Sequence, residues 1–92
     1  MENLKPAIDA AISGLVSPFS THQLIIAVAK ANQHAYIEAL HAELNNKRPF
    51  QSLHANIGRY LVTLPQLTKS EERCNDVDIW GDNSDNSLWL VK

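Results

Sequence analysis

The chain contains few of the residue types on which several folds and activities depend. It has a single cysteine, Cys74, in 92 residues, so no disulfide can form within the chain and disulfide-stabilised secreted folds are excluded. It has only three glycines and no glycine-rich loop of the kind that holds phosphate groups. Enzymes that need such a loop are therefore excluded.

Long apolar segments are also missing. The longest uninterrupted apolar run, Leu24 to Ala29, is far shorter than the roughly 20 residues that a helix needs to cross a bilayer. The N-terminal residues carry an acid before the first lysine and no sustained apolar stretch, unlike a secretory signal peptide. We therefore expect a cytoplasmic protein with no membrane partner.

The net charge of the chain is small. Eight lysines and arginines stand against ten aspartates and glutamates, which gives a formal net charge of −2. A strongly basic composition would have indicated nucleic-acid binding directly, and this composition does not. If the partner is a nucleic acid, binding must depend on where the basic residues lie locally.

Apolar residues recur every three or four positions over the first two thirds of the chain, which predicts helices. The first helix is expected over residues 4–16, with Pro6 in its first turn and Ser17-Pro18 as its stop. Residues 20–46 follow, either as one long helix or as two short helices that meet near Asn32-Gln33. We favour a break at that point, because asparagine is a fair helix cap.

Two separate signals mark the start of the second helical segment. Ser20 and Gln23 have the spacing of a capping box, in which each side chain accepts a hydrogen bond from the other residue's backbone N–H. Phe19 and Leu24 have the spacing of a hydrophobic staple across the same helix start. Both signals place the helix start at Ser20.

A last helix is expected over residues 50–63, after the short basic connector Lys47-Arg48-Pro49. Its predicted buried stripe consists of Phe50, Leu53, Ile57, Tyr60 and Leu61. The side chains that point away from this stripe or lie on its flanks are polar, small or basic: Gln51, Ser52, Ala55, Asn56 and Arg59.

The C-terminal residues predict a β-hairpin over 76–91, because two apolar runs flank the polar segment GDNSDNS. A hairpin centred on Ser84-Asp85 would place Trp80 opposite Trp89 and Ile79 opposite Leu90. The preceding residues, 66–76, are expected to be a polar link. The predicted fold class is therefore α+β, mostly helical, with three to four helices followed by a C-terminal hairpin in a single domain over residues 1–92.

From residue 20 onward this order of elements resembles the winged helix-turn-helix superfamily. In that plan a scaffold helix leads through a tight turn to a recognition helix, and a two-stranded wing follows. Residues 34–46 would be the scaffold helix, 50–62 the recognition helix and 76–91 the wing. The resemblance is architectural and carries no motif of a particular family.

The resemblance implies a DNA-binding protein, acting as a transcriptional regulator, with the recognition helix in the major groove. Asparagine and glutamine can pair with adenine, and arginine can reach guanine or phosphate. The expected nucleic-acid-binding residues are Lys47, Arg48, Gln51, Ser52, Ala55, Asn56 and Arg59. Such a protein could act as a homodimer.

The predicted wing departs from this plan, because its tip carries Asp82 and Asp85 and no base. Acids beside a phosphate backbone are repulsive, whereas bases supply most non-specific affinity. The alternative function is therefore a protein–protein interaction module on the same fold, with no nucleic-acid binding.

Catalytic and metal chemistry is not expected. His34, Glu38 and His41 share one helix face and could hold a divalent ion, but no fourth ligand can be named, so we interpret them as a solvated polar face. Cys74 stands beside Arg73, which could lower the pKa of its thiol, but catalysis also needs a positioned base, so we interpret this lone cysteine in a polar link as incidental. We predict no enzyme activity, no cofactor and no metal site.

Overall fold

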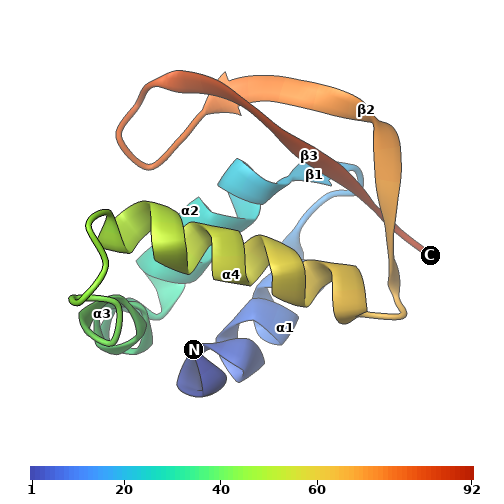
Figure 1. The fold of residues 1–92 in the computed structure, drawn as a ribbon. Helices are drawn as coiled ribbons and strands as arrows, with labels where there is room; N and C mark the ends of the chain where they lie inside the picture. The colour runs from blue at the N-terminus through green and yellow to red at the C-terminus, as the bar shows by residue number, and fades with distance from the viewer.

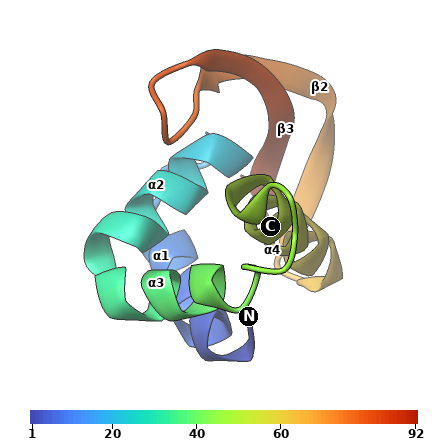
Figure 2. The same ribbon diagram turned by 60° about the vertical axis from the view of Figure 1, so that its left-hand side comes forward.

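The computed structural model describes residues 1–92 as four α-helices and a three-stranded antiparallel sheet. About half of the residues are helical and the two long strands lie at the C-terminus, so the expected α+β class is confirmed. The sheet lies on one side of the molecule and the helices pack beneath it (Figure 1). Turned by 60°, the long strands arch over α2 and α4 (Figure 2).

The elements follow one another in a simple order. They are a 3₁₀ turn (Glu2–Leu4), α1 (Lys5–Gly14), β1 (Phe19–Ser20), α2 (Thr21–Ala31), α3 (Gln33–His41), α4 (Pro49–Thr63), β2 (Leu67–Val77) and β3 (Asn83–Val91).

The start of α2 is as the sequence predicts. The N–H of Gln23 donates to Ser20 Oγ at 3.0 Å, and the N–H of Ser20 donates to Gln23 Oε1 at 2.8 Å, which completes the capping box. Both members of the predicted staple, Phe19 and Leu24, are buried. The capping box is therefore confirmed, and both residues of the predicted staple belong to the core.

The helix boundaries differ from expectation in two places. The break favoured near Asn32 is present, but α3 ends at His41 and not at Asn46, because the N–H groups that follow bond mostly three positions back instead of four. The first helix ends at Gly14 and not at residue 16, because Leu15 is extended, with φ −93° and ψ 144°. No helix is long and apolar enough to cross a membrane.

The predicted hairpin is wrong in its length and its register. Residues 66–76 are not a link, since all but the first belong to β2, and the chain reverses between Asp78 and Asp82 instead of at Ser84-Asp85. Trp89 pairs with Lys69 on one side and Phe19 on the other, so it does not face Trp80. The expected pairing of Ile79 with Leu90 is also absent, because Leu90 lies opposite Thr68.

The cause of the reversal is the side chain of Asp78. Its Oδ1 accepts the backbone N–H of Trp80 at 2.9 Å and that of Asp82 at 3.0 Å, as in an Asx turn. Gly81 has φ +83°, a left-handed conformation that glycine adopts without steric cost. These contacts close the turn several residues before the position expected from the polar segment.

One core lies between the sheet and the helices. Phe19 and Trp89, which are paired across β1 and β3, are 1% and 2% exposed and cover the helices from the sheet side. In the predicted stripe of α4, Leu53, Ile57 and Leu61 are fully buried, whereas Phe50 and Tyr60 are half-buried against the same core. α4 therefore has one side fixed against the core and the opposite side free.

Candidate nucleic-acid interface

The outer face of α4 is open to solvent. Gln51, Ala55 and Arg59 are exposed at intervals of four residues, which places them along one side of the helix. In Figure 1, α4 lies in front of the other helices with no element over it. The structure thus brings these three predicted site residues together.

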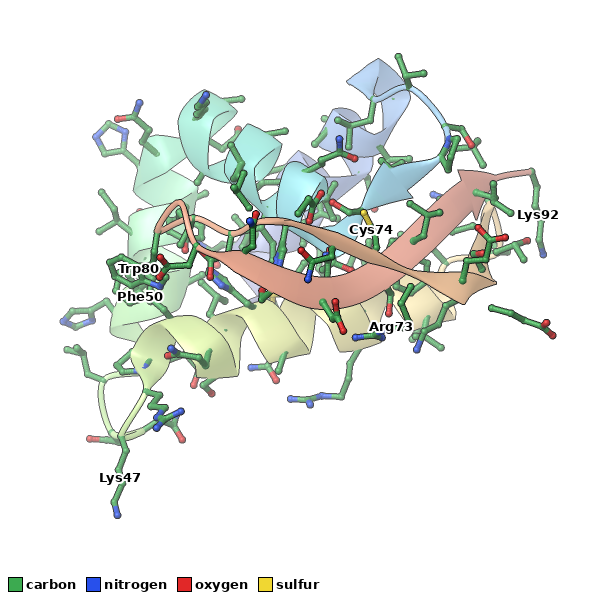
Figure 3. The ribbon with its side chains drawn as sticks, turned by 90° about the horizontal axis from the view of Figure 1, so that it is seen from above. Lys47, Phe50, Arg73, Cys74, Trp80 and Lys92 are labelled. Carbon is green, nitrogen blue, oxygen red and sulfur yellow. The ribbon has the colours of Figure 1, made fainter.

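The two basic residues before α4 form no ion pair with an acidic side chain. Lys47 and Arg48 are both exposed, and the one ion pair of the protein joins two other residues, Lys5 and Glu2, at 2.8 Å. Figure 3 shows the side chain of Lys47 extending away from the body of the molecule. Both cations are therefore available to an external anion at the start of α4.

Two further predicted site residues, Ser52 and Asn56, are half-buried. The side chain of Ser52 makes no hydrogen bond within the protein, whereas both ends of the Asn56 amide are engaged. Asn56 Nδ2 donates to Glu43 Oε1 at 2.7 Å, and Asn56 Oδ1 accepts from Arg59. Asn56 could pair with adenine only after these bonds break, so it is not freely presented as the helical wheel suggested.

Sequence reasoning missed the acid at the edge of this face. Glu43, in the connection between α3 and α4, bonds Asn56 through Oε1 and Asn46 Nδ2 through Oε2, the latter at 2.8 Å. Its negative charge lies beside Asn56, a residue expected to contact DNA. No local pattern indicates this contact, because it depends on how the connection folds back onto α4.

A fourth base borders the C-terminal half of α4. Lys5 Nζ lies 5.2 Å from the centre of the Tyr60 ring, and it shares a shallow hollow with Arg59. The hydroxyl of Tyr60 donates to Asp9 Oδ1 at 2.9 Å, and desolvation together with Asp9 raises the pKa of Tyr60. Lys5 therefore extends the basic surface, although Glu2 neutralises part of its charge.

The hairpin tip is packed onto the start of α4. The rings of Phe50 and Trp80 meet edge to face, with centroids 4.6 Å apart and an interplanar angle of 67°. His54 follows one turn along the helix, 6.2 Å from Phe50, and its Nε2 lies 2.6 Å from the Tyr36 hydroxyl. Figure 3 shows Trp80 and Phe50 side by side at this end of the molecule.

The Tyr36–His54 pair is held in its neutral form. Burial raises the pKa of Tyr36 to about 12. Burial, and to a smaller extent the charge of His22, lowers the pKa of His54, while Asp78 opposes that shift. His54 is thus neutral at pH 7, so its Nε2 can accept a hydrogen bond that the Tyr36 hydroxyl donates.

A chain of polar contacts attaches the hairpin to the start of α2. The Ser20 hydroxyl donates to Asp76 Oδ2 at 2.6 Å, and Asn86 Nδ2 donates to Asp76 Oδ1 at 2.8 Å. Asn86 Oδ1 accepts the N–H of His22 at 2.9 Å, and His22 Nε2 lies 2.7 Å from Ser84 Oγ. Every buried side-chain polar atom has a partner, so this network positions the hairpin without an unsatisfied group.

The residues considered for metal binding and for thiol reactivity are not arranged for either. His34, Glu38 and His41 do not form a group that could hold a metal ion. The suggestion that Arg73 lowers the pKa of Cys74 is wrong, because partial burial and the carboxylate of Asp76 raise that pKa.

The comparisons with known proteins give no further guide to the site. No protein-family model, curated protein or solved structure matches the chain.

Proposed function

We propose that the protein binds duplex DNA through the outer face of α4, as a small winged helix-turn-helix protein that serves transcriptional regulation. The order of elements and the sheet order β1-β3-β2 fit this plan. α3 would be the scaffold helix, α4 the recognition helix, and the hairpin of β2 and β3 the wing.

The observation that carries the proposal is the group of exposed, unpaired side chains at the start of α4. Lys47 and Arg48 have no acid partner, and the exposed Gln51 follows them on the open side of the helix. Cations at this position can hold phosphates while a glutamine reads an adenine edge. Arg59, two turns further along, can reach a guanine or a phosphate.

The charges favour moderate affinity that depends strongly on salt. With three phosphate contacts, from Lys47, Arg48 and Arg59, duplex binding should weaken roughly 40-fold between about 50 and 200 mM salt. Glu43 lies beside the same face and opposes the phosphates. Specific binding would then rest on base contacts more than on net charge.

The direct test is duplex-DNA binding by fluorescence anisotropy at about 50 and 200 mM salt. Lys47→Ala should weaken binding and reduce the slope of log K against log salt by about 0.9, the value for one phosphate contact. Lys92→Ala removes the same charge at the opposite end of the molecule and should leave both unchanged (Figure 3). Absence of binding at the lower salt, or an equal loss in both variants, would contradict the proposal.

A second function is favoured by a different observation. Trp80 is 58% exposed at the hairpin tip, where the charged residues are acids. Exposed aromatic residues are typical anchors of protein–protein interfaces. A protein-interaction module is therefore the alternative, and lack of DNA binding together with a partner on the hairpin would favour it.

A further inference from the structure

The hairpin tip presents one tryptophan to solvent, whereas the other tryptophan belongs to the core. Trp89 is 2% exposed, and its indole N–H donates to Thr21 Oγ1 at 2.8 Å. Trp80 is 58% exposed, and its indole N–H has no acceptor in the protein. Both the ring surface and the N–H of Trp80 are therefore available to a partner.

Trp80 is also held in place before any partner arrives. Its ring packs edge to face on Phe50, and its backbone N–H is bonded to Asp78 Oδ1. The same oxygen accepts the N–H of Asp82, while the N–H of Asp78 donates to the Asp82 carbonyl at 2.8 Å. An aromatic side chain fixed in this way loses little conformational entropy on binding, which is the property of a good anchor.

The charged residues in the part of the hairpin that carries Trp80 all have one sign. Residues 74–91 contain four aspartates and no lysine or arginine, and none of these aspartates forms an ion pair. The carboxylates of Asp76, Asp78 and Asp85 accept hydrogen bonds within the protein. The carboxylate of Asp82 has no partner, and it lies in the same turn as Trp80.

We propose that Trp80 and Asp82 form a docking site for an arginine side chain in a basic segment of a partner protein. A guanidinium stacks on an indole ring through cation–π attraction and pairs with a carboxylate through two N–H donors. The free indole N–H can donate to a backbone carbonyl of the same segment. The acidic tip attracts such a segment and repels a polyanion, which decides against a nucleic acid as the occupant.

This site is separate from the proposed DNA-binding face. Phe50, which holds Trp80, and Gln51 are consecutive on α4 and therefore point about 100° apart. Lys47 extends away from the Trp80–Phe50 pair (Figure 3). A basic partner could thus dock on the hairpin tip whether or not α4 binds DNA.

The test uses a labelled octa-arginine peptide and the intact protein, with binding followed by anisotropy near physiological salt. Trp80→Ala and Asp82→Asn should each weaken binding about three- to fivefold, since an exposed cation–π pair or ion pair has an energy of that order. Glu71→Gln is the matched charge control, because Glu71 lies in β2 seven positions before Asp78, about 20 Å along the strand and beyond the range of unscreened attraction. It should change the affinity less than about 1.5-fold.

Asp82→Asn keeps the turn, because the Asp82 carboxylate makes no hydrogen bond, so it tests the site even if Trp80→Ala unfolds the protein. A single-stranded oligothymidylate is the competing probe. The proposal is overturned if octa-arginine does not bind, if Asp82→Asn and Glu71→Gln weaken it equally, or if a folded Trp80→Ala variant binds as tightly as the wild type. Tighter binding of the oligothymidylate, lost in Trp80→Ala, would assign the site to nucleic acid and overturn it too.

Discussion

The hydroxyl of Ser20 lies 2.6 Å from Asp76 Oδ2, and this bond joins the start of α2 to the end of β2 next to the hairpin turn. Ser20 Oγ also accepts the N–H of Gln23 and so caps the helix. Ser20 is fully buried, so neither bond can be replaced by water without a rearrangement. One side chain therefore couples the helix start to the position of the hairpin.

Replacing Ser20 by alanine should destabilise the protein by about 2 kcal/mol or slightly more. The lost cap accounts for about 0.5–2 kcal/mol, and the lost hydrogen bond to the Asp76 carboxylate adds to it. Urea unfolding measures the difference in the free energy of unfolding. Ser13→Ala, at an exposed serine of α1, is the control and should stay within about 0.5 kcal/mol of the wild type. Equal midpoints for Ser20→Ala and the wild type would contradict both roles of Ser20.

Replacing Glu43 by glutamine should tighten duplex-DNA binding about two- to fivefold at low salt. The change removes one repulsive charge beside Asn56 while an amide oxygen can still accept the Asn56 hydrogen bond. The gain should fall as salt rises, because the repulsion is screened. Glu71→Gln, which alters an exposed acid of β2, should have no such effect. A loss of affinity in Glu43→Gln would mean that Glu43 does not face the DNA.

The double variant Asp82→Asn with Asp85→Asn separates the two partner hypotheses. Loss of two negative charges near the tip should raise the affinity for any duplex and lower the affinity for the arginine peptide. The fold should be kept, because turn positions accept asparagine as readily as aspartate and the residue at 85 can still accept the Asn75 hydrogen bond. Both affinities are measured by anisotropy on the same preparation.

Arg59→Ala is the companion variant on α4. If Arg59 makes a base contact, its loss should weaken specific DNA binding by about 1–3 kcal/mol, while the arginine peptide should bind as before. Unchanged DNA binding in Arg59→Ala and in the double aspartate variant would show that neither α4 nor the hairpin tip touches DNA, and the DNA proposal would be abandoned.

The stability of the protein should decrease as the pH falls below about 6.5, the ordinary pKa of histidine. Burial lowers the pKa of His54 in the folded state, so below that pH the unfolded chain binds a proton that the folded chain does not accept. The contribution is complete at pH 7 and is lost as the pH falls through the folded-state value. Urea midpoints between pH 7 and pH 5 should therefore decrease less in His54→Gln than in the wild type. His41→Gln, at an exposed histidine, should keep the wild-type slope.

Local patterns in the sequence determined where most helices begin and which side of each faces the core. The cap at Ser20, the break at Asn32 and the start of α4 at Pro49 depend on residues within one helical turn. The apolar stripe of α4 likewise follows from helical spacing alone, and Leu53 and Ile57 are buried as it requires. These features were predictable because the interactions that produce them join neighbours in the chain.

The tertiary structure alone decided the strands and the contacts around the candidate sites. β2 is almost entirely polar, so its sequence carries no alternation, and it becomes a strand because its backbone pairs with β3 from one end to the other. That pairing, with the turn closed by Asp78, moves Trp80 away from Trp89 and onto Phe50. The bond between Glu43 and Asn56 likewise joins the connection after α3 to the middle of α4. Register and long-range contacts depend on which partner each backbone and side chain meets after folding, and no short stretch of sequence records that partner.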